Sequence, residues 1–227
     1  MDPALTSLLA ASLAFVGTHF AMSHPLRAPM VGLLGEKGFL GLYSLVSLAC
    51  LVWMVLAFRA APTGSGGLQG ALGTASWIVA SLLTLVALVL FLGSHRGNPA
   101  APNTPIEKVA AAKVRGVFAV TRHPMMWSFA LWALAHLLLH WSMRTTILAG
   151  AILVLALLGS HFQDRKKELL MGDAWAGWEA KTSYWPRLGA LFGVAPVLWL
   201  AALALWLAIT WAHIPAAGVP AGIWRWV

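Results

Sequence analysis

Residues 72–93 read LGTASWIVASLLTLVALVLFLG and contain no charged side chain. A run of about 20 apolar residues is long enough to cross the hydrocarbon core of a bilayer as an α-helix. The next six residues, SHRGNP, bring a histidine, an arginine and a proline together, which indicates the end of the apolar segment. This stretch therefore predicts a membrane-spanning helix.

Comparable apolar runs recur along the chain. Six spans are expected, at residues 4–22, 39–58, 72–93, 125–141, 145–162 and 191–212. The apolar residues do not alternate with polar ones as they do in a membrane β-barrel. The fold class expected is therefore all-α: a polytopic integral membrane protein that forms one domain over residues 1–227 and has six transmembrane helices.

The composition excludes several classes of protein. The chain of 227 residues is 60% hydrophobic and only 10% charged, whereas soluble domains have about 25% charged residues. A soluble enzyme, a disordered chain and a fibrous protein are thereby excluded. The net charge of +8 is spread between the apolar runs, so we expect the lipid bilayer as partner and no nucleic acid. The single cysteine, Cys50, excludes an internal disulfide and a Cys-rich zinc site.

Charge also predicts the orientation. If six spans alternate, only three of the 15 Lys and Arg residues, Arg59, Arg144 and Arg225, share the side of the termini. By the positive-inside rule the other side is cytoplasmic, so both termini lie outside, as expected in a bacterial inner membrane. The long cytoplasmic connections are then 94–124 and 163–190. We expect a short helix near 106–118 and an amphipathic helix at the membrane interface over 168–179.

Two histidines fall inside apolar spans. Ionisable residues at membrane depth are costly and mark functional sites, so His19 and His136 are candidates. Three interpretations stay open: a neutral imidazole bonded to a carbonyl, a metal ligand, or a proton carrier. Two histidines from different helices can bind the iron of a haem within a bundle. His19 is nearer the cytoplasmic boundary than His136, so such a ring would have to lie oblique to the membrane.

A second group of candidates lies at the cytoplasmic mouth. Arg122 and His123 precede Pro124 at the start of a predicted helix, where free backbone N–H groups favour a carboxylate or phosphate. Asp164 and Arg165 end the next span on the same side and are expected to pair with them. Tyr43 belongs to a helical stripe that either packs or lines a cavity. The candidate cofactor-binding residues are Arg122, His123, Tyr43, Asp164 and Arg165.

The motifs together resemble those of the NnrU family. They are Ser23-His24-Pro25-Leu26-Arg27, Gly35-Glu36, Leu42-Tyr43-Ser44-Leu45, Thr121-Arg122-His123-Pro124-Met125, Leu131 to His136, Asp164-Arg165 and Thr182-Ser183. The family was named for a link to nitric oxide and denitrification. It also includes the plant and cyanobacterial 15-cis-zeta-carotene isomerase, which binds haem b through histidines that match His19 and His136. The resemblance implies haem b and redox chemistry on an apolar polyene or lipid-like molecule, or a role in nitric-oxide metabolism.

A more distant resemblance is to isoprenylcysteine carboxyl methyltransferases, which share an Arg-His-Pro motif before a helical hairpin and bind S-adenosylmethionine. Met126 and Gln163 depart from the residues usual in that family. Two alternative functions therefore stay open. One is an S-adenosylmethionine-dependent membrane methyltransferase using Arg122, His123 and Asp164, and the other is a non-enzymatic assembly or regulatory factor.

Overall fold

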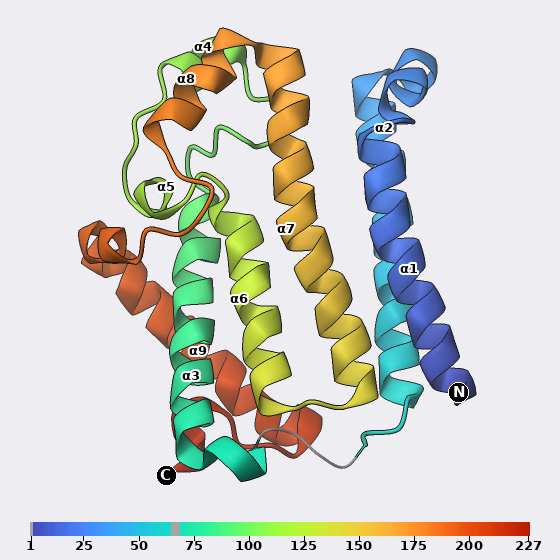
Figure 1. Ribbon diagram of the computed structural model, residues 1–227, viewed down its shortest axis with the longest axis vertical. Helices are drawn as coiled ribbons and strands as arrows, with labels where there is room; N and C mark the ends of the chain where they lie inside the picture. The colour runs from blue at the N-terminus through green and yellow to red at the C-terminus, as the bar shows by residue number, and fades with distance from the viewer. Residues whose placement is uncertain (1, 65–68) are drawn as a thin grey trace.

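The structure is a computed structural model that describes residues 2–64 and 69–227. Within these residues all regular elements are helical (Figure 1). The long helices are α1 (Pro3–Ser23), α2 (Arg27–Ala60), α3 (Gln69–Ser94), α6 (Pro124–Leu139), α7 (Met143–Met171) and α9 (Pro196–Ala217). The short elements are α4 (Ile106–Ala110), α5 (Val117–Val120), α8 (Asp173–Lys181) and the 3-10 turns η1 (Leu188–Gly193) and η2 (Gly222–Arg225).

Five of the long helices have the length and apolar character needed to cross a membrane: α1, α2, α7, α9 and the part of α3 that begins at Gly73. The expected all-helical membrane fold is therefore confirmed in its class. The remaining apolar helix, α6, has 16 residues, or about 24 Å at the rise of an α-helix. It is shorter than the predicted span 125–141 because the chain leaves the helix at His140.

The long helices pack as neighbours along one row. α6 lies between α3 and α7, α7 lies between α6 and α1, and α2 packs on α1 (Figure 1). α9 packs on α3. The larger buried cluster joins α3, α6, α7, α8 and α9, and a smaller one joins α1, α2 and the first turns of α7. The α1–α2 pair is thus attached to the rest of the bundle chiefly through α7.

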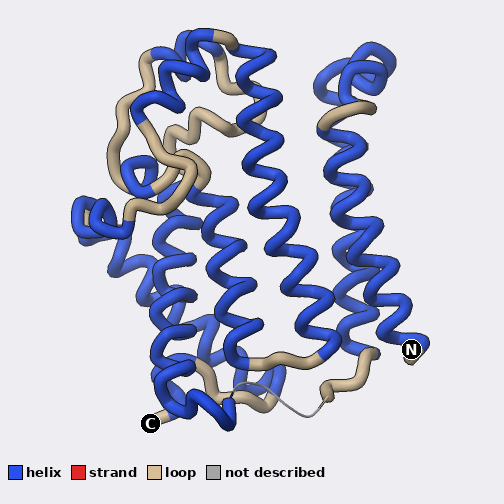
Figure 2. Tube along the Cα trace, viewed as in Figure 1, coloured by secondary structure: helices blue, strands red, loops and turns tan. Residues whose placement is uncertain are grey.

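The two ends of the bundle differ. α1 begins and the chain finishes at one end, which we call the terminal end (Figure 1). The long irregular segments around residues 95–123 and 172–195 gather toward the opposite end, the loop end (Figure 2). The loop end carries most of the Lys and Arg residues between the spans, so charge and chain topology divide the molecule in the same way.

Two expectations for the loop end hold only in part. A short helix begins at Ile106 as expected, but α4 ends at Ala110, and α5 begins only at Val117, after Gly116 with its positive φ of 56°. The interfacial helix expected over 168–179 is interrupted at Gly172 (φ 51°), where α7 ends and α8 begins. Positive φ is cheap for glycine and strained for other residues.

The tryptophans of α8 do not face lipid either. Trp175 and Trp178 are 0% and 2% exposed and belong to the larger buried cluster. The ring of Trp178 meets Phe118 of α5 edge to face, with centroids 6.0 Å apart. The apolar residues of 168–179 therefore do not share one face: the two tryptophans pack on protein, whereas Leu169 and Leu170, at the end of α7, are exposed.

A glycine allows three helices to meet closely at the loop end. A β-carbon on Gly93 of α3 would overlap Val117 of α5 and lie 3.0 Å from Leu198 of α9. We expect Gly93→Ala to lower the melting temperature of the detergent-purified protein, because overpacking a tight contact costs about 1–3 kcal/mol. Gly150→Ala is the matched control: this α7 glycine has no neighbour within 4 Å of a new β-carbon, and alanine favours a helix. Equal melting temperatures for the two variants would contradict the packing.

Candidate functional site

Four charged or titratable side chains form a cluster at the loop end, which we call the clamp: Arg122, His123, Asp164 and Glu179. Arg122 Nε and Nη2 both donate to Asp164 Oδ2, at 2.9 and 2.7 Å. Arg122 Nη2 also lies 3.0 Å from Glu179 Oε1. His123 Nε2 lies 2.7 Å from Asp164 Oδ1. The expected pairing of Asp164 with Arg122 and His123 is therefore present.

The clamp connects segments that are distant in sequence. Arg122 and His123 stand just before α6, Asp164 lies on α7, and Glu179 lies on α8. Backbone hydrogen bonds from Arg122 N to Ser183 O and from Arg187 N to Val120 O, both 2.8 Å, join the chain before α6 to the chain after α8. The clamp thus fixes where α6, α7 and α8 meet.

Burial determines what the clamp can do. The side chains of His123 and Asp164 are 1% and 5% exposed, and a buried charge is tolerated only when paired. Burial and the nearby Asp164 carboxylate raise the pKa of Glu179 above its ordinary value, against the pull of Arg122. His123 Nδ1 is buried and has no hydrogen-bond partner within the part of the chain that the structure describes. Because Arg122 already contacts two carboxylates, the clamp serves as a structural junction rather than as an open anion site.

Arg165 is not part of the clamp. Its side chain is 64% exposed and pairs with Glu168 one turn along α7, at 3.1 Å. Arg165 follows Asp164 directly, and consecutive residues of a helix point in directions about 100° apart. The structure therefore separates these two neighbours, which the sequence had placed in one site.

A cavity of about 620 Å³ opens between the α1–α2 pair and α6–α7. This is within the usual range for a pocket that binds a small molecule. Its walls are largely apolar, and they include Phe15, Phe20, Phe39, Leu40, Leu51, Met54, Met126, Phe129, Ile152 and Leu155. Two of the sequence candidates, His19 and Tyr43, also line it. We call this the central cavity.

His19 is held in a defined orientation in the central cavity. Its Nδ1 lies 2.6 Å from the carbonyl oxygen of Phe15, one turn earlier in α1, so Nδ1 carries the ring proton and donates it. Its ring meets that of Tyr43 edge to face, with centroids 5.3 Å apart. The lone pair of Nε2 has no hydrogen-bond partner among the described residues. This is the arrangement in which a histidine binds a metal through Nε2.

The mouth of the central cavity is positively charged. Arg27, Lys166 and Lys167 line it with a single carboxylate, Glu36. Arg27 Nη2 pairs with Glu36 Oε1 at 2.6 Å, and this pairing follows from the bend of α2 at Gly35 (φ 69°). Burial, and to a lesser extent repulsion from Lys166, lowers the pKa of His24, which also lines this cavity.

The structure does not bring His19 and His136 together. α1 and α6 run in opposite directions along the bundle, and each histidine lies about one turn from the C-terminal end of its helix. His19 is therefore near the loop end and His136 near the terminal end. α7 also lies between the two helices (Figure 1). One porphyrin iron bound by both histidines, as the sequence led us to expect, does not fit this arrangement.

His136 has a different neighbour. Its Nδ1 lies 2.8 Å from the carbonyl oxygen of Trp132, and its ring centroid is 6.5 Å from that of His213 on α9. His213 was not a candidate from sequence, because it follows the last apolar run and has no motif around it. Among the described residues there is no group of three or more His, Cys, Asp or Glu side chains placed to hold a metal ion.

Comparison with known proteins agrees with the motifs. A family model described as NnrU protein matches residues 7–221. The chain belongs to the NnrU family. The match includes the clamp and continues past the last of the quoted motifs through the whole of α9. No curated protein and no solved structure matches the chain.

The buried ion pair between Arg122 and Asp164 should contribute to the stability of the fold. We expect Arg122→Gln to lower the melting temperature strongly, because it leaves the buried Asp164 carboxylate with only His123 beside it, and breaking a buried ion pair costs about 3–5 kcal/mol. Arg165→Gln is the matched control, since it removes the same charge from the residue that follows Asp164 but from an exposed pair, which contributes about 0–1 kcal/mol. The role of the clamp is refuted if both variants melt together.

Proposed function

We propose that this NnrU-family protein crosses a bacterial inner membrane six times, with α6 as the sixth span and both termini outside. The apolar character of α6 and its position between α3 and α7 support this count. The basic loop end supports a cytoplasmic location for that end. The short length of α6 is compatible with a membrane-embedded helix whose neighbours are longer, because the bilayer thins locally around a short span.

We further propose that the central cavity binds an amphiphilic anion, and that haem b is the molecule it suits best. The observation that supports this is His19, with an unprotonated Nε2 in an apolar cavity whose mouth carries Arg27, Lys166 and Lys167. A porphyrin combines a large apolar ring, a metal that accepts imidazole, and two carboxylates. The donor set of the cavity matches these three features.

The protein's own residues have distinct tasks in this proposal. The carbonyl of Phe15 orients His19 and fixes its tautomer. Arg27 and the two lysines attract the carboxylates, and the apolar walls exclude water. Met54 and Met126 line the same cavity and supply thioether groups, which also serve as axial iron ligands in some haem proteins. His136 has no part in the site.

When bound, haem would supply redox or Lewis-acid chemistry for an apolar, polyene-like substrate, or would bind nitric oxide. The first alternative corresponds to isomerase activity, and the second to a role in denitrification. The cavity lies between helices that face lipid, so an apolar substrate has a path from the bilayer. The residues of the cavity support the binding of an amphiphile equally in both cases.

The methyltransferase alternative has less support. It assigns S-adenosylmethionine to Arg122, His123 and Asp164, but these side chains bind each other within the clamp. A non-enzymatic role is compatible with the clamp but gives no reason for the central cavity. We therefore favour the haem proposal over both.

Reporter fusions test the topology. Alkaline phosphatase, which is active only outside the cytoplasm, should be active when fused after Val227 and inactive when fused at Lys113 in the loop between α3 and α6. The physical reason is the concentration of Lys and Arg at the loop end. An inactive fusion at Val227 together with an active one at Lys113 would reverse the orientation, and inactivity of both fusions would remove α6 from the count of spans.

Absorbance spectroscopy tests the haem site. After expression with ample haem, the detergent-purified protein should show a Soret band near equimolar with protein. His19→Ala should lose or shift that band, because it removes the cavity imidazole whose Nδ1 is bound to the Phe15 carbonyl and whose Nε2 is left for a metal. His136→Ala and His161→Ala, an exposed α7 residue, should leave it unchanged.

Other spectra would contradict the haem site at His19. A parent protein without a Soret band excludes haem, and a band that survives His19→Ala but not His136→Ala moves the site to the terminal end. Gel filtration of each variant distinguishes loss of ligand from loss of fold. If His19→Ala and His136→Ala both leave the spectrum unchanged, neither histidine is an iron ligand and the proposal is overturned.

A further inference from the structure

A second and larger cavity, of about 1340 Å³, lies at the loop end. We call it the loop cavity. It is enclosed by the connection from α3 through α4 to α5, and by η1 and the first turns of α9. Four basic residues line it: Arg96, Lys108, Lys113 and Arg115. None of the described residues that line it is an Asp or Glu, which distinguishes this cavity from the central one.

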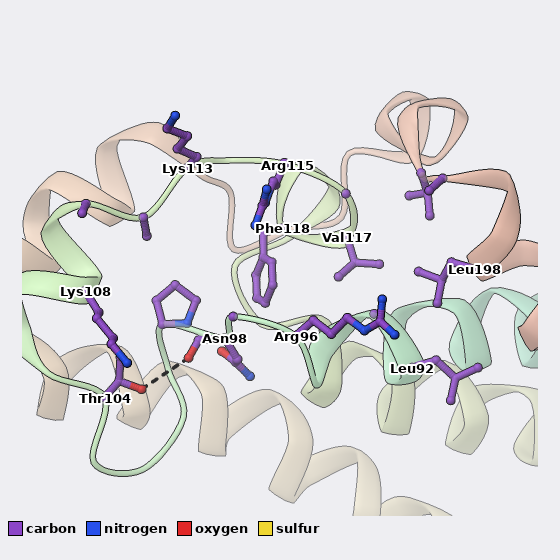
Figure 3. A pocket seen from close by; sticks show the side chains of 18 of the residues that line it. Leu92, Arg96, Asn98, Thr104, Lys108, Lys113, Arg115, Val117, Phe118 and Leu198 are labelled. Atoms are coloured by element: carbon purple, nitrogen blue, oxygen red, sulfur yellow. Dashed lines mark hydrogen bonds between the residues drawn. The ribbon is translucent and has the colours of Figure 1, made fainter.

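The basic residues of the loop cavity are unneutralised. Among the described residues, none of the four side chains forms an ion pair. Figure 3 shows Arg115 beside Phe118, Arg96 extending toward Val117 and Leu92, and Lys108 pointing toward Thr104 on the other side of the pocket, whereas Lys113 points away. Repulsion between like charges in one cavity is reduced when an anion lies among them. The loop cavity therefore gathers basic side chains on several of its walls, with no carboxylate among the described residues that line it.

The rest of the loop cavity is apolar and is placed at the edge of the membrane. Leu92 is two residues before the end of α3, and Leu198 is two residues after the start of α9. Both helices are long and apolar enough to cross a membrane. The cavity is thus at the depth where the phosphates of lipids lie. Its basic residues are on the side away from the membrane, and the ends of α3 and α9 are on the membrane side.

The apolar side continues toward the bilayer along α9. Val197 also lines the cavity and is 70% exposed, and Leu200, on the next turn, is 67% exposed. An exposed apolar strip that starts inside a basic hollow fits a molecule with a charged head and hydrocarbon chains. A free phosphate ion would use the cations but would leave this strip without a partner.

From this juxtaposition we propose that the loop cavity is a binding site for an anionic phospholipid. The phosphate lies among Arg96, Lys108 and Arg115, and the acyl chains lie along the exposed face of α9. Basic residues at the surface of a membrane each add about 1 kcal/mol to the binding of anionic lipid. Scattered basic residues give only a diffuse attraction, whereas this cavity gives a bound lipid a defined position.

The loop cavity shares a wall with the central cavity. Residues 102–104 line both, and this segment is tied to α7 by hydrogen bonds from Gln163 Nε2 to Ala100 O, 3.1 Å, and from Lys167 Nζ to Ala101 O, 3.3 Å. A lipid in the loop cavity therefore contacts the segment that also closes the mouth of the central cavity. The lipid site itself does not depend on what the central cavity binds.

Native mass spectrometry of the full chain in detergent tests the proposal. Dioleoyl phosphatidylglycerol should form a one-to-one complex that survives delipidating detergent, and dioleoyl phosphatidylcholine, which has the same chains, should bind at least about tenfold more weakly. The triple variant Arg96→Gln, Lys108→Gln, Arg115→Gln should lose the preference for phosphatidylglycerol. The control variant Lys37→Gln, Lys181→Gln, Arg187→Gln removes the same charge from residues that line neither cavity and should keep it.

Three outcomes would overturn the site. The first is equal affinity for the two lipids, and the second is an equal loss of preference in the triple variant and in its control, which would indicate diffuse attraction only. The third is displacement of phosphatidylglycerol by millimolar inorganic phosphate, which would assign the cations to a free ion. Matching circular dichroism spectra for both variants exclude unfolding as the cause of any loss.

Discussion

The ion pair between Arg122 and Asp164 is the contact on which the arrangement of the loop end depends. An ionised carboxylate that is 5% exposed is tolerated only with close, well-directed partners, and Arg122 and His123 supply them from the chain before α6. Because Asp164 is on α7, the pair fixes these helices relative to each other. Glu179 extends the same constraint to α8, and the backbone bonds beside it hold the chain that leads to α9.

Both cavities follow from this constraint. Gln163 and Lys167 lie on either side of Asp164 and donate hydrogen bonds to the carbonyls of residues 100 and 101. The segment that separates the two cavities is therefore attached to the same part of α7 that carries Asp164. The α1–α2 pair, by contrast, contacts the bundle chiefly through α7. Buried ion pairs thus fix one half of the loop end, whereas none of the described ion pairs joins the α1–α2 pair to α7 across the opening of the central cavity.

The two cavities differ in the charge of the residues that line them. In the central cavity the basic mouth is partly neutralised by Glu36, and His19 offers a directed lone pair below it, so the site suits one amphiphile with a metal or another imidazole-binding group. In the loop cavity the cations have no protein partner, and no directed ligand accompanies them. This difference is the reason why we propose a specific molecule for the first cavity and a class of membrane lipids for the second.

The sequence by itself determined three things. The length of the apolar runs determined the class of the fold, and the order of the motifs determined the family. The pairing of Arg122, His123 and Asp164 followed from the cost of leaving a buried charge unpaired. Tertiary structure alone decided which distant residues meet. His19 and His136 looked alike as imidazoles in apolar runs, yet antiparallel helices carry them to opposite ends of the bundle. Likewise the tryptophans of α8 carried an interfacial pattern, and only the position of α5 turned their face inward, since an amphipathic helix buries its apolar side on whichever surface it meets.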